Sequence, residues 1–414
     1  MIVLKGKKYC CGCHACGNVC PKQCISMLAD EQGFLYPNVD TENCINCGLC
    51  EKVCPIINQK ENRKPIKIYA AKNKNEEVRR KSSSGGVFTL LAEYVLNNDG
   101  VVFGAKFDDD WNVVHAWTDN IEDLAAFRGS KYVQSTIGNT YREAKEFLTQ
   151  GRKVLFSGTP CQIAGLKKYL RTDYDNLITM DIICHGVPSP KVWQDYLSTL
   201  RASFRNQCGV GRNSDSSLNK LPVITSISFR DKTNGWKKYG FELRYNTASK
   251  IANNKGSNSA NDNEHIFLQS FMENVFMKGF LANLYLRPSC YVCATRSGKS
   301  GADISVGDYW GIQNFHPKFD DDKGIGLILI NTLEGKELFG KFDTECIETT
   351  YDNALIGNPC VEHSVTMTKY VKMFWDNPTL ENIETICKKK QPGFVKKVVF
   401  KIRAIIVSLL KRLK

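Results

Sequence analysis

Two copies of one cysteine motif hold the residues of this sequence best suited to chemistry. The first copy is Cys10-x2-Cys13-x2-Cys16-x3-Cys20 and the second is Cys44-x2-Cys47-x2-Cys50-x3-Cys54, each followed by proline. This spacing is typical of bacterial ferredoxins, in which three thiolates hold one [4Fe-4S] cluster and the fourth, before the proline, binds the other cluster. We therefore predict one cluster on Cys10, Cys13, Cys16 and Cys54. We predict a second cluster on Cys44, Cys47, Cys50 and Cys20.

A pair of zinc sites is the alternative interpretation of these cysteines. Zinc sites usually contain two CxxC pairs rather than three cysteines at intervals of three residues before Cys-Pro. Cys11 and Cys24 exceed the number of ligands needed, and we interpret them as packing residues. The first residues, MIVLKGKKYCC, lack the apolar run of a secretory signal. Eighteen cysteines without an export signal indicate reduced thiols, so we expect a cytoplasmic protein.

Four further cysteines lie in three separate segments of the remaining chain. They are Cys161 in GTPCQIAG, Cys184 in IICHGVPSP, and the CxxC pair Cys290 and Cys293. The first two follow apolar runs that predict buried strands, and the carboxyl ends of such strands form the binding edge of an α/β sheet. The four thiols could hold a third [4Fe-4S] cluster, or they could be small buried hydrophobic side chains. The other cysteines are predicted to be structural: Cys208, Cys346, Cys360 and Cys387.

Five segments occur in one order along the chain: SSSGGVFTLLAEYVL, GTPCQIAGLKKYL, CHGVPSP, the CxxC pair and ADISVGDYWG. Together with the N-terminal cysteines, they resemble the family of coenzyme F420 hydrogenase/dehydrogenase beta subunits as far as about residue 335. The resemblance implies an iron–sulfur flavoprotein oxidoreductase that binds FAD, with coenzyme F420 as a further cofactor of the family. It also implies a third cluster on Cys161, Cys184, Cys290 and Cys293. Some relatives belong to bacterial polysaccharide biosynthesis, which leaves the small organic substrate open.

A serine- and glycine-rich turn precedes an apolar helical pattern and suits the phosphates of FAD. Its residues are Ser82, Ser83, Ser84, Gly85 and Gly86. Free N–H groups and hydroxyls at a helix N-terminus bind phosphate or pyrophosphate. An ordinary serine cap followed by flexible glycines is the alternative. The turn matches neither GxGxxG nor GxxxxGK[ST], so we predict neither a Rossmann site nor an ATPase.

Four other side chains are candidates for contact with the flavin or its substrate. Lys131 in RGSKYVQS could supply a cation to the cofactor, although an exposed surface lysine is the alternative. Thr159 and Gln162 flank Cys161 and could hydrogen-bond flavin ring atoms. His185 is the candidate catalytic proton donor because imidazole titrates near neutral pH, with a structural histidine as the alternative.

Strand and helix patterns predict the elements that position these residues. Apolar segments 68–72, 101–107, 153–159, 178–184 and 326–332 indicate buried strands, and 84–98 and 139–151 have helical periodicity. The fold class is α+β: a bacterial-type ferredoxin module over 1–60, then a larger α/β flavin-binding domain with a mixed sheet over 66–385. Residues 206–264 are a variable insertion with a β-hairpin around an Asn-Gly turn. We expect a helical segment over 265–283.

The basic charge is concentrated at the C-terminal end. The net charge is +13, and ten Lys and Arg but no acid follow Glu384. The rest of the chain is nearly neutral, so no nucleic-acid partner is predicted. The tail, 390–414, predicts a basic amphipathic helix whose apolar stripe over 395–414 suits an anionic membrane surface. A helix docked on its own domain or on a partner is the alternative.

The sequence therefore predicts an iron–sulfur flavoprotein oxidoreductase. Its clusters would exchange electrons with a ferredoxin-like or other redox donor protein, and its flavin would reduce or oxidise a small organic substrate. The alternative is a non-catalytic electron-transfer subunit that relays electrons to a separate catalytic partner.

Overall fold

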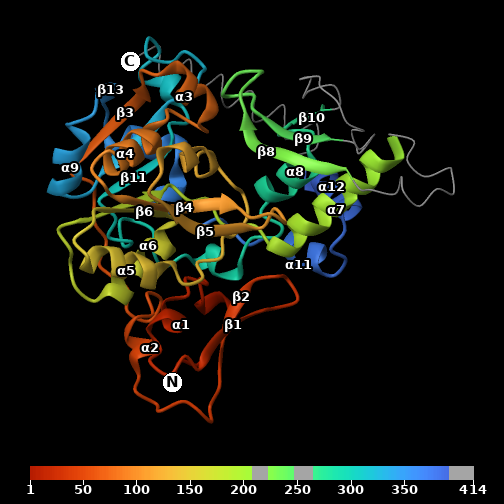
Figure 1. Ribbon diagram of the computed structural model, residues 1–414. Helices are drawn as coiled ribbons and strands as arrows, with labels where there is room; N and C mark the ends of the chain where they lie inside the picture. The colour runs from red at the N-terminus through yellow and green to blue at the C-terminus, as the bar shows by residue number, and fades with distance from the viewer. Residues whose placement is uncertain (208–221, 247–263, 391–414) are drawn as a thin grey trace, which may run out of the picture.

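The computed structural model describes residues 1–207, 222–246 and 264–390 (Figure 1). The cluster module (residues 1–60) lies below a body built on a large sheet, and a three-stranded arm lies to one side of that body. Apart from Lys390, the predicted tail helix (390–414) lies outside the described residues, and so does Cys208, which was predicted to be structural. Within the described ranges, no helix is long and apolar enough to span a membrane.

Short elements separated by turns form the cluster module. In chain order they are η1 (Lys7–Tyr9), α1 (Ala15–Val19), β1 (Ile25–Ala29), β2 (Leu35–Val39) and α2 (Leu49–Lys52). β1 and β2 pair antiparallel. α1 and α2 begin after left-handed residues, His14 with φ 61° and Gly48 with φ 72°. Each of these helices carries the third cysteine of its motif, so the repeated sequence folds into repeated structure.

An eight-stranded mixed sheet forms the body. From edge to edge the strands are β13 (Thr344–Glu348), β3 (Lys67–Asn73), β12 (Gly326–Ile330), β11 (Ile304–Asp308), β7 (Leu177–Ile182), β6 (Val154–Gly158), β4 (Val101–Phe107) and β5 (Val113–Thr118). β11, β7, β6 and β4 run parallel, and the other pairs are antiparallel. All the predicted strands are present, and the predicted mixed sheet is confirmed. β5, β11 and β13 were not predicted.

Helices cover both faces of the sheet. On one face pack α4 (Val87–Leu96), α9 (Leu333–Phe339) and η2 (Ile121–Ala126). On the other pack α5 (Thr140–Thr149) and α6 (Pro160–Leu170), and the module residues Cys11, Cys13, Ala15 and Val53 share that core. The cluster module is therefore packed against the body. Residues 61–67, which connect the module to the body, are also fixed to the body, because Arg63 N donates to Ser297 O at 2.8 Å.

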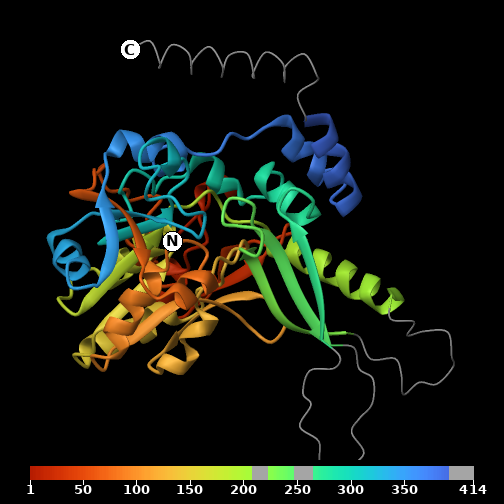
Figure 2. The ribbon, with the colours of Figure 1, turned by 90° about the horizontal axis from the view of Figure 1, so that it is seen from above.

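The arm consists of β8 (Val223–Asp231), β9 (Gly240–Asn246) and β10 (Glu264–Ser270), which extend away from the body (Figure 2). An aromatic core joins it to α7 (Pro190–Gln207), α8 (Val275–Leu281), α11 (Lys369–Trp375) and α12 (Leu380–Lys390). The predicted hairpin is present, but residues 232–239 connect its strands, so Asn-Gly is only part of the turn. The expected helix over 265–283 is wrong in its first half, because 264–270 pair with β9 and Asn274 caps α8.

Short helices complete the described chain. They are α3 (Glu76–Lys81), η4 (Pro288–Val292), η5 (Ile312–Asn314), α10 (Tyr351–Gly357) and η6 (Pro359–Val361).

Candidate functional site

The motif cysteines gather in two groups within the cluster module. Cys10, Cys13, Cys16 and Cys54 lie close together: the charges of Cys16 and Cys54 raise the pKa of Cys13, and that of Cys10 raises the pKa values of Cys16 and Cys54. Cys20, Cys44, Cys47 and Cys50 line a second, separate cavity. The fourth cysteine of each motif thus lies with the first three of the other copy, which is the arrangement predicted from the spacing. Ligation of iron by these residues stays a prediction.

The chemistry of these thiols fits metal clusters. All the cysteines in the described part of the chain are free thiols. Burial raises the pKa of Cys16 to about 12, and burial also raises the pKa of Cys54. Thiolates are therefore unfavourable there unless a bound metal supplies positive charge. Cys24, predicted to be a packing residue, lines the second cavity with its Sγ 3.4 Å from that of Cys20.

The second cysteine set meets at one cavity, here called the four-cysteine cavity. Cys161 lies in the first turn of α6, Cys184 follows β7, and Cys290 and Cys293 lie in and just after η4; all four line this cavity. Thr159 caps α6, and its Oγ1 lies 3.2 Å from Cys161 Sγ. Three segments that are distant in sequence thus supply four thiols to one space, as a cluster requires.

A buried arginine in the wall of the four-cysteine cavity favours an anionic occupant. Arg296 is 7% exposed, and its guanidinium donates to the backbone oxygens of His185, at 3.1 Å, and Cys360. Its Nε has no hydrogen-bond partner among the described residues. In those same ranges no carboxylate lies within 4 Å of it. A buried cation without an anion is costly, so a cluster with four thiolate ligands fits this space.

Two cysteines predicted to be packing or structural residues also line the four-cysteine cavity. Cys11 is buried, and its thiol interacts with those of Cys13 and Cys161, so it lies between the first cysteine group and this cavity. Cys360 lines both this cavity and a larger neighbouring one. Neither residue belongs to a spaced motif, so no sequence signal could have located these positions.

A cavity of about 510 Å³, here called the large cavity, adjoins the four-cysteine cavity. Both are lined by Ile182, Ile183, Cys184, Gly186, Val187 and Cys360. Cofactor sites commonly have volumes in this range. Every residue predicted to contact the flavin or its substrate lines it: Ser82, Ser83, Ser84, Gly85, Gly86, Lys131, Thr159, Gln162 and His185.

The Ser-Gly turn presents backbone more than hydroxyls to the large cavity. Gly86, with φ 82°, precedes α4, whose first N–H groups have no acceptors within the helix. A Cβ on Gly85 would lie 2.3 Å from Ala71 O, so only glycine fits there. Ser82 and Ser84 donate their hydroxyls to backbone oxygens, both at 2.7 Å. Ser83 Oγ accepts from Ser130 N at 2.6 Å, which leaves its own hydrogen for a ligand.

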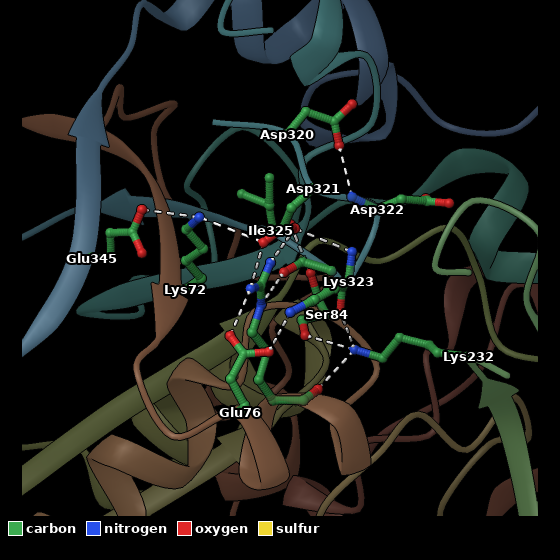
Figure 3. Close-up of polar contacts among 12 residues, drawn as sticks. Lys72, Glu76, Ser84, Lys232, Asp320, Asp321, Asp322, Lys323, Ile325 and Glu345 are labelled. Atoms are coloured by element: carbon green, nitrogen blue, oxygen red, sulfur yellow. Dashed lines mark hydrogen bonds and ion pairs between the residues drawn. The ribbon is translucent and has the colours of Figure 1, made fainter. Parts of the chain in front are cut away.

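A polar network holds this turn against the neighbouring loop (Figure 3). Lys232, from the loop after β8, donates to the backbone oxygens of Arg79, Ser84 and Lys323 at 2.8, 3.1 and 2.8 Å. Arg79 forms a bidentate ion pair with Asp321, at 2.8 and 2.6 Å. The arm therefore contributes directly to the shape of the predicted phosphate site.

Lys131 brings a cation to the large cavity, and no carboxylate of the described chain lies within 4 Å of it. Its Nζ donates to Arg128 O and Gly129 O at 3.2 and 3.3 Å. Burial lowers its pKa to about 7. A bound phosphate would stabilise its charged form, which fits the predicted role.

Thr159 and Gln162 are already hydrogen-bonded within the protein. Gln162 Oε1 accepts from Thr159 N at 2.8 Å, which closes a capping box at the start of α6. Gln162 Nε2 donates to Ser135 Oγ at 2.9 Å, and Ser135 lies 2.9 Å from His115 Nδ1. These contacts fix the helix that carries Cys161, while contact with flavin ring atoms stays a prediction.

His185 lies at the wall between the two cavities. Its Nε2 is 2.6 Å from Asn283 Oδ1, so Nε2 carries the hydrogen and Nδ1 can accept a proton. Burial lowers its pKa. The neutral ring is therefore better suited to accept a proton than to donate one, and its predicted catalytic role stays untested.

Residues of the arm also line the large cavity, which the sequence did not predict. Arg230 pairs with Asp308 at 2.5 and 3.2 Å, and its guanidinium lies 4.0 Å from the ring centre of Tyr239. All three residues line the cavity. The ion pair between Arg230 and Asp308 joins the arm to the end of β11. Because the two residues are 78 positions apart in the sequence, no local pattern predicts this pair.

Family models match most of the chain. The model of the coenzyme F420 hydrogenase/dehydrogenase beta-subunit N-terminus matches 68–140, and that of its C-terminus matches 151–207 and 224–355. The chain belongs to this family. A 4Fe-4S dicluster domain matches 9–56, which contains all eight motif cysteines. The chain is therefore an iron–sulfur redox protein of the family, as the sequence predicted.

Three proteins to which this chain is similar are the following. A coenzyme F420-dependent sulfite reductase of Methanocaldococcus jannaschii is 31% identical over 189 residues, 43% of this chain and 28% of the relative. One subunit of the F420H2 dehydrogenase of Methanosarcina mazei is 24% identical over 185 residues, 42% of this chain and 51% of the relative. A chain of the F420-reducing [NiFe] hydrogenase complex of Methanosarcina barkeri aligns with a TM-score of 0.44 at 18% identity, over 80% of this chain and 95% of that one. The chain thus spans about half or less of the two curated relatives.

Proposed function

We propose that this chain is an electron-relay subunit of an oxidoreductase, with its cluster sites and a flavin site arranged in series. The order of the sites carries the proposal. Cys11 lies between the first cysteine group and the four-cysteine cavity, and the wall at 182–187 separates that cavity from the large one. Bound [4Fe-4S] clusters carry single electrons, and a bound flavin exchanges them for electron pairs.

The chain's own residues would bind the flavin and shield it from water. The first-turn N–H groups of α4, the Ser83 hydroxyl and the Lys131 cation suit its phosphates. The capping box of α6 orients Cys161, and Arg296 supplies positive charge beside the four thiols. The names of two similar proteins include F420, which is a deazaflavin. We therefore propose F420 as one molecule that exchanges electrons with the bound flavin. A role in polysaccharide biosynthesis stays a prediction.

Direct action of the flavin on a small organic substrate is the second candidate function. The large cavity extends beyond the Ser-Gly turn to His185 and to Arg230 and Tyr239 of the arm. These side chains supply a proton acceptor, a cation and an aromatic face, which are groups that bind and position a small organic molecule.

Anaerobic purification of the full chain tests both functions. A relay predicts about twelve irons with matching sulfide, one flavin, and flavin reduction by a reduced ferredoxin only when the clusters are loaded. Clusters without flavin would reject the flavin part of the proposal. Turnover of an organic acceptor without a second protein would favour the second candidate.

A further inference from the structure

Arg287 reaches from the body into the cluster module. It directly precedes η4 and is 0% exposed. Its Nε donates to Cys10 O at 2.8 Å, and its Nη2 lies 3.6 Å from Cys10 Sγ and 2.9 Å from Leu35 O. Its Nη1 donates to Gln134 Oε1 at 2.9 Å. The guanidinium therefore lies directly against a predicted cluster ligand.

No acid of the described chain neutralises this cation. In the part of the chain that the structure describes, no carboxylate lies within 4 Å of Arg287. Its other neighbours are the rings of Phe34 and Tyr36, with centres 5.4 and 4.3 Å from Cζ. Backbone oxygens and ring faces only partly offset the cost of burying a full charge. An anionic group bound beside Cys10 would supply the missing negative charge.

The local backbone makes room for this contact. Gly12 has φ +68°, and a Cβ there would lie 2.7 Å from Arg287 Nη1. Glycine between Cys11 and Cys13 thus permits both the turn and the approach of the guanidinium. Arg287 also accepts, through its backbone oxygen, a hydrogen bond from Cys290 N at 2.8 Å. One residue therefore contacts predicted ligands of two different cluster sites.

We propose that Arg287 is the counter-ion of the cluster on Cys10, Cys13, Cys16 and Cys54 and raises the reduction potential of that cluster. This inference rests on the proposed function, because it requires a cluster at that site. Four thiolates make the bound cluster anionic, and reduction adds a further negative charge. A fixed cation and an N–H···S contact stabilise the reduced form more than the oxidised form. The cluster nearest the body would thereby accept electrons from the outer cluster.

Arg142 provides a matched control for a purely structural role. It also reaches from the body to the cluster module, where Nε donates to Asn18 O at 2.9 Å and Nη2 to Gly17 O at 3.0 Å. Both of these acceptors are backbone oxygens rather than cysteine sulfurs. Arg142→Gln therefore loosens the same interface without removing a charge from a ligand.

The test is a redox titration of the full-length, cluster-loaded chain followed by electron paramagnetic resonance. The signal that Cys10→Ser alters identifies the relevant cluster. In Arg287→Gln, the ratio of reduced to oxidised cluster at a fixed potential should fall about tenfold, which is about 59 mV for one electron. Arg287→Lys keeps the charge but loses the separate contacts of the planar guanidinium, so its ratio should lie between those of the wild type and Arg287→Gln, within about threefold of the wild type. Arg142→Gln should leave the ratio unchanged.

Three results would overturn the inference: an unchanged ratio in iron-loaded Arg287→Gln, an equal fall in Arg142→Gln, or loss of iron from both Arg287 variants. If Arg287→Gln alone loses its iron, the Arg287→Lys variant decides. A tenfold fall in its ratio of reduced to oxidised cluster, with the positive charge still present, would reject the proposal. A wild-type chain that binds no clusters would instead reject the proposed function, so the two failures can be distinguished.

Discussion

Gly165 of α6 faces Cys13 of the cluster module so closely that no side chain fits between them. A Cβ at Gly165 would lie 2.8 Å from Cys13 Cβ and 2.9 Å from its Sγ. The same Cβ would lie 2.9 Å from the hydroxyl of buried Tyr141. The missing side chain thus brings a predicted cluster ligand into the core of the body.

Gly165→Ala should destabilise the protein by about 1–3 kcal/mol, the usual cost of overpacking a core. It should also lower the iron content, because Cys13 must shift. Thermal unfolding and iron analysis of the purified variant measure the two effects. Gly340→Ala is the control, because its Cβ meets only ordinary contacts at 3.4 and 3.6 Å. Equal behaviour of the two variants would contradict the argument.

Cys11 and Cys161 should differ in their effect on iron content. Cys161→Ser removes one of four predicted ligands and should cost about four irons per chain. Cys11→Ser keeps a small polar group in a buried site and should retain all the iron, with only a modest loss of stability. Iron and sulfide analysis after anaerobic purification decides. Loss of about four irons in Cys11→Ser would make Cys11 a ligand and refute our assignment.

Lys232→Met should weaken flavin binding about tenfold, or about 1.4 kcal/mol. The variant leaves the backbone oxygens of Arg79 in α3, Ser84 in the Ser-Gly turn and Lys323 in the neighbouring loop without their shared donor, so the predicted phosphate site loses its shape. Flavin titration of the cluster-loaded chain measures the affinity. Lys237→Met, which breaks an ion pair with Asp320 in the same region, is the matched control. An unchanged affinity in Lys232→Met would show that the network does not shape the site.

His115 should make stability depend on pH. Burial lowers its pKa from 6.5 to about 4, so between these values the unfolded chain binds a proton that the folded chain does not. Stability should therefore fall as pH falls through this window, by about 1.4 kcal/mol per unit. The stability advantage of wild type over His115→Asn in urea unfolding should shrink by about 2 kcal/mol from pH 6.5 to pH 5. A constant difference would mean that the folded protein accepts the proton.

Arg230 and Asp308 should behave as a buried pair. Arg230→Met leaves the largely buried carboxylate of Asp308 without its cation and should lower the free energy of unfolding by about 3–5 kcal/mol. The double variant Arg230→Met with Asp308→Leu should recover much of that loss, because no charge remains buried alone. Unfolding in urea at neutral pH measures the double variant and the two single variants, Arg230→Met and Asp308→Leu. If the two single effects simply add, the residues are not coupled in the way the geometry indicates.

Local patterns determined a large part of this protein. The spacing of the eight motif cysteines predicted the cluster module because three ligands of each cluster lie at intervals of three residues on one tight loop, and the fourth precedes a proline in the other copy. Short continuous apolar runs predicted five strands of the body's sheet, because a strand that is buried on both faces needs apolar side chains at successive positions. The Ser-Gly turn could be predicted from the sequence because serine and glycine residues directly before an apolar helical pattern indicate a helix N-terminus. The strand β10 was missed because its pairing with β9 outweighed a helical pattern.

Tertiary structure alone decided which residues share a site. Arg287 and Cys10 are far apart in sequence, as are Arg296 and Cys184, and no periodicity relates a buried cation to a thiol in another segment. The sequence indicated only packing or structural roles for Cys11 and Cys360, whereas the folded chain places both residues in cavity walls. The arm's Lys232 and Arg230 gained their roles from the loop and strand that they contact. Motif spacing follows from bond lengths along the chain, whereas these contacts follow from how separate elements pack, which only the folded chain determines.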